Sequence, residues 1–162
     1  MSRMIRVRET RSGLDCRFEL LDALAPRAAE VLWALAAQDG ALHDAVHAMW
    51  TGPEISCPVR IETAVDPALL RDIPDENATS FPAAGELATV FAPRGRWKGM
   101  PPFDVFDIGL FYGDGARLLM PMGWIMGSVC ARVLPEDLAG LQAGCKAIRA
   151  SGACRLGFSR VP

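Results

Sequence analysis

His43 and His47 are the only histidines in the chain, and they are four residues apart. On a helix this spacing would place both imidazoles on one face, where they could hold a metal ion together. On a strand they would share a face but lie roughly 13 Å apart at about 3.3 Å per residue, too far to share an ion. His47 alone is suited to proton transfer, because histidine exchanges protons readily near neutral pH. The alternative is a hydrogen-bonded histidine that only supports the fold. We expect no metal ion and no cofactor.

Trp50 and Glu54 flank a Thr-Gly-Pro turn a few residues further on. Trp50 would give a small ligand an apolar wall, and Glu54 could act as a base or hold an amine. The structural alternative is a tryptophan that closes one end of the fold beside a solvated glutamate. We predict substrate binding for Trp50 and catalysis for Glu54.

Tyr112 and Arg117 lie on either side of Gly113-Asp114-Gly115, which reads as a hairpin turn between two strands. Tyr112 is the only tyrosine, and we predict that it takes part in catalysis. Arg117 stands next to Leu118, Leu119 and Met120, so it needs a partner or an anion, and its planar guanidinium suits a carboxylate. The partner is either a substrate or an acidic side chain on a neighbouring strand.

Asn77 and Trp124 complete the predicted set of substrate-binding residues. Asn77 precedes an apolar strand and either binds a substrate carboxylate or carbonyl group or forms a turn with its own backbone. Trp124 lies between Met122 and Met126, which could form an adaptable apolar lip over a pocket. Core packing or a contact between subunits of a homo-oligomer would produce the same pattern.

The composition sets limits on the function. The chain has 162 residues, of which 51% are apolar and 22% charged, and its net charge is −2. The length predicts one domain with a hydrophobic core of its own. The small negative net charge does not indicate binding to nucleic acid or to an anionic membrane. The five cysteines show no C-x-x-C spacing, and the start carries charges where a signal peptide is apolar. We therefore expect reduced thiols and a cytoplasmic protein.

The periodicity of the chain predicts mostly strands. Residues 14–20 alternate between apolar and charged side chains, and residues 42–50 fit either a helix or a strand. Helices are expected to begin at Pro26 and Pro135. Residues 60–84 form a long excursion with one helical turn at 67–71, and residues 92–102 a basic loop. The remaining strands are predicted at residues 4–8, 55–59, 85–91, 105–112, 116–122 and 127–134, with a closing strand marked by Cys154, Leu156 and Phe158.

About eight strands and two helices follow from this pattern. We expect an antiparallel sheet that is closed or nearly closed, with most neighbouring strands joined by hairpins and one helix over each open end.

Several segments carry a resemblance to a known family. FELLDALAPRAAEVLWAL is similar to the strand and proline-capped helix that open cyclophilins. HAMWTGPE, ENATSFPAAGEL, FYGDGAR and MGWIMGSVCARV together resemble the bacterial DUF3830 family, a cyclophilin-like group of uncharacterised function. The resemblance covers nearly the whole chain. It implies a single domain over residues 1–162, mainly β, built as a closed eight-stranded antiparallel barrel with two capping α-helices.

The same resemblance argues against prolyl isomerisation, the reaction of true cyclophilins. Their site uses an arginine that follows a histidine in a Phe-His-Arg strand, together with a Gln-Phe-Phe strand. Here Ala48 stands at the position of the arginine, and Ile108-Gly109-Leu110-Phe111 lacks the glutamine. Cucumopine synthases, a distant cyclophilin-like group, condense an amino acid with a keto acid. They show only that such a barrel can host small-molecule chemistry.

The sequence leads to a first hypothesis and three alternatives. The first is a small-molecule enzyme in which Arg117 and Asn77 hold a carboxylate-bearing substrate. His47 or Glu54 would then move a proton in an isomerase, lyase or condensation reaction. The alternatives are a non-catalytic ligand- or peptide-binding barrel, a residual prolyl isomerase and a structural subunit of an oligomer.

Overall fold

The first hairpin shows how alternating side chains produce strands in this chain. The computed structural model describes residues 2–38, 40–60, 66–71, 73–100 and 102–162. In it, β1 (Met4–Glu9) pairs antiparallel with β2 (Leu14–Leu20). Every second residue of β2, beginning at Leu14, is buried, and the residues between them reach solvent. Gly13 has a φ of 73°, which suits the tight turn between the two strands.

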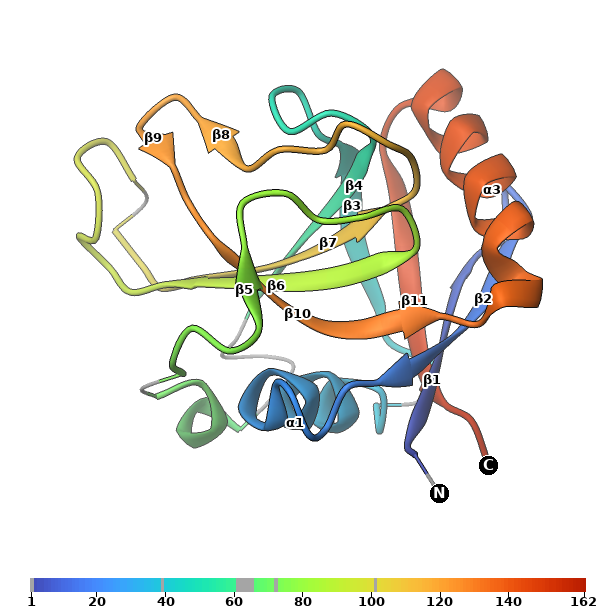
Figure 1. The fold of residues 1–162 in the computed structure, drawn as a ribbon, viewed down its shortest axis with the longest axis horizontal. Helices are drawn as coiled ribbons and strands as arrows, with labels where there is room; N and C mark the ends of the chain where they lie inside the picture. Colours follow the sequence, from blue (N-terminus) through green and yellow to red (C-terminus); the bar gives the residue numbers. More distant parts are fainter. Residues whose placement is uncertain (1, 39, 61–65, 72, 101) are drawn as a thin grey trace.

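Eight strands close into an antiparallel barrel, which confirms the predicted fold (Figure 1). Around the barrel the order is β2, β1, β11, β3, β4, β7, β6 and β10, and β10 pairs with β2 to close it. Only three of these eight pairings join strands that are consecutive in the described chain. The expectation that hairpins join most neighbours is therefore wrong. The strands not yet given bounds are β3 (Leu42–His47), β4 (Glu54–Val59), β6 (Glu86–Ala92), β7 (Val105–Phe111), β10 (Gly127–Val133) and β11 (Cys154–Arg160).

Two helices pack against the barrel and complete its core. Figure 1 shows α1 (Pro26–Leu35) and α3 (Leu138–Ser151) on different sides of it. α1 begins at Pro26, as predicted. Pro135 instead opens a short 3-10 turn, η2 (Pro135–Asp137), and α3 begins after it at Leu138. Their buried faces, which include Leu32 and Leu141, belong to the same apolar cluster as the inner residues of the barrel.

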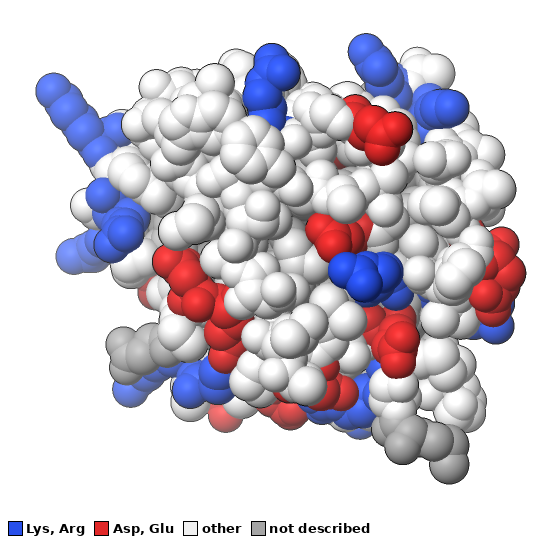
Figure 2. All heavy atoms as spheres, viewed as in Figure 1, with Lys and Arg blue, Asp and Glu red and all other residues white. Residues whose placement is uncertain are grey.

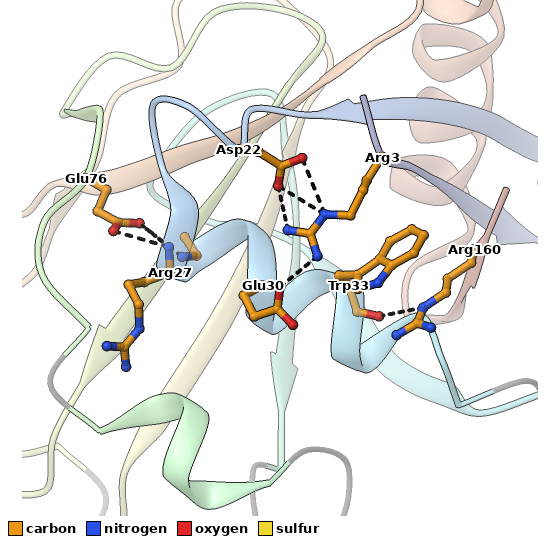
Figure 3. Close-up of polar contacts among 8 residues, drawn as sticks. Arg3, Asp22, Arg27, Glu30, Trp33, Glu76 and Arg160 are labelled. Carbon is orange, nitrogen blue, oxygen red and sulfur yellow. Dashed lines mark hydrogen bonds and ion pairs between the residues drawn. The ribbon is translucent and has the colours of Figure 1, made fainter. Parts of the chain in front are cut away.

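Charged residues fix α1 to the barrel (Figure 3). Arg3 of the N-terminal segment forms ion pairs with Asp22 and Glu30, and its guanidinium lies 5.2 Å from the centre of the Trp33 ring. At the start of the helix, the Glu76 carboxylate accepts hydrogen bonds from two free backbone N–H groups. A carboxylate at this position also complements the positive end of the helix.

The segment after β7 differs from its prediction. Residues 116–122 were expected to form a strand hairpin-linked to β7, but β7 pairs with β4 and β6 instead. Only β8 (Leu119–Met120) forms there, and it pairs with β9 (Gly123–Trp124) in a small separate hairpin. The reason is a second apolar cluster outside the barrel, in which Leu118 packs against Phe111 and Val129.

The other ambiguous segments also have defined structures. Residues 42–47 form β3, so the strand alternative holds there, and residues 48–53 make a bend. The excursion contains η1 (Pro67–Leu70) at its predicted helical turn and ends in β5 (Ala78–Thr79), which pairs with β10. Part of it, residues 61–65 and 72, lies outside the described residues. In the part of the chain that the structure describes, no helix is long and apolar enough to cross a membrane.

Candidate active site

A pocket of about 290 Å³ lies against the outer face of the barrel where β4 and β7 run side by side. Successive residues of a strand point to opposite faces. The buried residues Ile55 and Ile108 therefore fill the barrel, while Glu54, Ser56 and Asp107 face outward. The described residues that line the pocket are Val46, His47, Ala48, Met49, Trp50, Thr51, Glu54, Ser56, Pro58, Val90, Ala92, Trp97, Met100, Val105, Asp107, Leu118, Met120, Met122 and Ile125.

Glu54 is the most deeply buried acidic group of this pocket, with 4% of its surface exposed. Its Oε2 accepts a hydrogen bond from Oγ1 of Thr51, which is buried to the same extent. Burial raises the pKa of Glu54 to about 7; the negative charge of Asp107 adds to the rise, while the Thr51 bond opposes it. Glu54 can therefore carry a proton at neutral pH.

Asp107 supplies a second carboxyl group to the same pocket. Its Oδ1 accepts a hydrogen bond from Ser56 Oγ at 2.9 Å. Burial raises the pKa of Asp107 to about 6, against the effect of the bonds from Ser56 and the Ile108 backbone. No described arginine or lysine forms an ion pair with either carboxyl group.

One oxygen of each carboxyl group remains available to the pocket. Among the described residues, neither Glu54 Oε1 nor Asp107 Oδ2 has a hydrogen-bond partner. In that same part of the chain, no fully buried side-chain oxygen or nitrogen is left without a partner. Neither oxygen is therefore fully buried, and both belong to residues that line the pocket.

Gly109 makes room for the Glu54 carboxyl group. It lies on the outer face of β7, directly opposite Ser56 of β4. A Cβ atom at this position would lie 2.4 Å from Glu54 Oε1 and 2.8 Å from the Phe111 ring. Any larger residue would push the carboxyl group away, so the absence of a side chain here positions Glu54.

His47 and Tyr112 form a hydrogen-bonded pair next to the carboxyl groups. His47 Nδ1 lies 2.9 Å from the Ala48 carbonyl oxygen, which can only accept, so Nδ1 carries the proton. In the neutral ring, Nε2 then accepts a hydrogen bond from the Tyr112 hydroxyl at 2.8 Å. Tyr112 is 3% exposed and belongs to the core, and burial raises its pKa. Both nitrogens of His47 are thus occupied by the protein.

Much of the remaining pocket wall is apolar and comes from three segments at the surface. The bend after β3 provides Met49 and Trp50, the loop after β6 provides Trp97 and Met100, and the β8–β9 hairpin provides methionines. Figure 1 shows the hairpin and the loop after β6 on the same side of the barrel. In Figure 2 the surface over β8 and β9 is largely free of charged side chains.

A family model described as "Protein of unknown function (DUF3830)" matches residues 8–160. The chain belongs to the DUF3830 family. No curated protein sequence matches it.

Solved structures show what this DUF3830 barrel is similar to. McbB in complex with tryptophan superposes with a TM-score of 0.59 at 14% identity, over 94% of this chain and 44% of McbB. The chain thus spans less than half of that protein. A cyclophilin-type peptidyl-prolyl cis-trans isomerase from Cryptosporidium parvum superposes with a TM-score of 0.51 at 15% identity. The match covers 100% of this chain and 99% of the isomerase chain. The Mimivirus cyclophilin superposes with a TM-score of 0.53 at 10% identity, over 99% of this chain and 89% of the cyclophilin chain. At these identities the likeness shows a cyclophilin-like fold.

The structure brings some of the predicted site residues together and leaves others apart. His47, Trp50 and Glu54 line the pocket, and Tyr112 reaches it only through His47. Ala48, which the resemblance places where cyclophilins have their arginine, also lines the pocket.

Besides Tyr112, three further predicted residues lie outside the pocket lining. Asn77 donates a hydrogen bond from Nδ2 to the Val129 carbonyl and holds the excursion onto β10, with a φ of 47°. Arg117 is exposed and precedes β8, so it does not lie within a strand as expected. Trp124 is 56% exposed and packs against Phe81 at 5.3 Å between ring centres.

The histidine pair does not form a metal site in this geometry. His43 and His47 lie on a strand, and the His43 ring packs 5.8 Å from that of Phe158, where burial lowers its pKa. Within the described ranges, no group of three or more histidine, cysteine or acidic residues is placed to hold a metal ion.

Asp107 and Ser56 were missed in the sequence. The signal was present, because Asp107 is a charged residue in the middle of an otherwise apolar strand, on the face opposite Phe106 and Ile108. What the sequence did not show is the pairing of β4 with β7, which places Asp107 opposite Pro58 and beside Ser56 across 51 residues of chain.

Proposed function

We propose that this protein is a small-molecule enzyme that carries out acid–base chemistry with Glu54 and Asp107. The observation that carries the proposal is the pair of carboxyl groups in one apolar pocket, each held by a hydroxyl group and each with one free oxygen. Carboxyl groups whose pKa values are raised toward neutrality, chiefly by burial, are typical of catalytic acids and bases. An ion pair would serve a structural role better, and neither carboxyl group forms one with any residue that the structure describes.

The two groups suit different roles. Glu54 has the higher pKa, about 7 against about 6 for Asp107, so near neutral pH a larger share of Glu54 than of Asp107 carries a proton. Because the two sites interact, these values describe the pair as a whole. Asp107 would take the proton that the substrate loses, and Glu54 would give the proton that it gains. Exchange with water through the open pocket would restore both groups, so an isomerase, lyase or condensation reaction fits this balance.

The proposed substrate is a small molecule with an apolar body. The tryptophan and methionine side chains of the pocket supply apolar contact of adaptable shape. Arg117 and Asn77 do not line the pocket, so they give no support to a carboxylate-bearing substrate held between them. A cytoplasmic location remains part of the proposal, supported by five free and buried cysteines.

The second candidate is a non-catalytic ligand-binding barrel. It is favoured by the methionines of the pocket rim, since Met49 is 80% exposed and Met122 39% exposed. Such a rim can adapt to a ligand without any chemistry. McbB is described as a complex with tryptophan, so one protein that shares this fold holds a small molecule. Residual prolyl isomerisation has less support, because Ala48 offers no cation to the pocket.

A metabolite-turnover assay separates these functions. Wild-type protein, E54Q, D107N and the control D114N are incubated with metabolite mixtures, and depletion is followed by mass spectrometry. Asp114 is an exposed acidic residue outside the pocket. We expect turnover by wild type and D114N, and a loss of about 10²–10⁴-fold in E54Q and D107N. Full turnover by both pocket variants would overturn the proposal. Ligands that raise Tm and are recovered unchanged would favour the binding alternative.

A further inference from the structure

The free side-chain acceptors of the pocket are carboxyl oxygens, and its free side-chain donors are the indole N–H groups of Trp50 and Trp97. The hydroxyl groups of Thr51 and Ser56 donate to the two carboxyl groups, and both nitrogens of His47 are occupied. Among the charged side chains of the described lining, the oxygens that remain for a ligand are Glu54 Oε1 and Asp107 Oδ2. A buried carboxylate oxygen accepts hydrogen bonds and attracts positive charge.

The pocket also lacks a positive charge of its own. None of its described lining residues is a lysine or an arginine. The basic residues of the loop after β6, which are Arg94, Arg96 and Lys98, are exposed and do not line it. The nine residues outside the described ranges include no lysine or arginine. Two neighbouring carboxylates without a cation are costly, so a cationic ligand would be stabilised in this position.

The walls of the pocket suit the same kind of ligand. Trp50 and Trp97 can present aromatic faces to a cation, and they can also stack against a flat apolar group. The remaining walls are apolar side chains from β6 and the β8–β9 hairpin, such as Val90, Leu118 and Met120. The volume of about 290 Å³ is at the small end of ligand pockets.

We infer that the substrate or ligand of this pocket is a small amine, with its protonated nitrogen between Glu54 Oε1 and Asp107 Oδ2 and its apolar body against Trp50, Trp97 and the methionines. The inference rests on the proposed function, because the same two carboxyl groups bind the ligand, and it adds the chemical class of that ligand. The amine competes with the protons of the carboxyl groups. Its affinity therefore rises with pH as Glu54 and Asp107 ionise; His47 is the other titratable residue among the lining.

Three matched probes test this inference by calorimetry on the full chain. They are 2-phenylethylamine, the neutral 2-phenylethanol of similar shape, and the anionic 3-phenylpropionate. At pH 8 the amine is still protonated, and we expect it to bind at least about tenfold more tightly than either analogue. This preference should shrink at pH 5 and disappear in the E54Q/D107N double variant. The control D114N should bind all three probes as wild type does.

Three results would overturn the inference. They are equal or tighter binding of either analogue, an amine preference that survives in E54Q/D107N, and no amine binding at millimolar concentration. If one of these occurs while turnover still depends on Glu54 and Asp107, only the amine class is wrong. If the amine binds as expected but no metabolite is turned over, the acid–base function is wrong and the pocket is a binding site.

Discussion

The carboxylates beside α1 and the carboxyl groups of the pocket are in opposite situations. Beside α1, Asp22 and Glu30 share the guanidinium of Arg3, and Glu76 caps the first backbone N–H groups of the helix (Figure 3). In the pocket, Glu54 and Asp107 each accept a hydrogen bond from a hydroxyl group, and neither forms an ion pair with a described lysine or arginine. The first set has its partners within the protein, and the second leaves room for an external one.

Ionisation of the two sets of carboxyl groups changes the stability of the folded protein in opposite directions. A carboxylate paired with arginine favours the folded state when it is ionised, although a partly exposed pair contributes only about 0.2–1 kcal/mol. A buried carboxyl group with a raised pKa is destabilising once it is ionised. Between its ordinary pKa and its raised one, the folded protein binds more protons than the unfolded chain, so stability falls as pH rises. For Glu54 this window extends from 4.5 to about 7.

E54Q is expected to give the largest effect, because glutamine cannot ionise. At pH 8 the variant should be more stable than wild type by up to about 3 kcal/mol, and at pH 4 the difference should disappear. The amide oxygen can still accept the Thr51 hydrogen bond, so little else changes. Urea unfolding across this pH range measures the effect.

D22N is the matched change beside α1. It removes one of the two carboxylates of Arg3, and because Asp22 is 38% exposed we expect a loss of about 0.5–1 kcal/mol at pH 7. The two substitutions thus shift stability in opposite directions. If E54Q lowered stability at pH 8 as D22N does, the Glu54 carboxylate would have a stabilising partner and the comparison would fail.

G109A should give the next largest effect, because it fills the space that Glu54 occupies. The added methyl group would collide with Glu54 Oε1 and the Phe111 ring, which we expect to cost about 1–3 kcal/mol. Urea unfolding at pH 5, where most of Glu54 is protonated, isolates this steric cost from the electrostatic one. The amine preference of the pocket should be lost at the same time.

G140A is the control for this substitution. Gly140 lies in α3, and the nearest atom to an added Cβ would be Cys16 Sγ at 3.8 Å. Alanine is a better helix residue, so we expect a gain of about 0.5–1 kcal/mol. The double variant G109A/E54A should recover part of the lost stability, since it removes one of the colliding groups. If it recovers none, Gly109 is required only by Phe111.

The sequence predicted the region beside α1 better than the pocket. Pro26 and the helical spacing of Val31, Leu32 and Leu35 place α1 correctly, because these signals are local. The alternation in β2 is equally local, and with the family resemblance it leads to the closed barrel. The short β8–β9 hairpin was not predicted, because Leu118 packs outside the barrel rather than in a strand.

The pocket was predicted only in part because it depends on contacts between distant segments. Trp50 and Glu54 are close in the sequence and lie in the pocket together. Asp107 joins them through the pairing of β4 with β7, and no local pattern specifies that pairing. Arg117 was predicted to lie inside a strand near a carboxylate, but it is exposed where the chain leaves the barrel.

Y112F tests whether the His47–Tyr112 pair only supports the fold, as the ion pairs beside α1 do, or belongs to the active site. Both side chains have hydrogen-bond partners within the protein, like the carboxylates beside α1, but His47 lines the pocket and Tyr112 lies behind it. Removing the hydroxyl group leaves His47 Nε2 without its partner, which should cost about 1 kcal/mol. The control S151A removes an exposed hydroxyl group and should change stability by less than about 0.5 kcal/mol. If the pair only supports the fold, Y112F should retain both amine binding and turnover. A loss of turnover with unchanged binding would instead support the predicted catalytic role of Tyr112, and would extend the active site from the two carboxyl groups to the hydroxyl group behind His47.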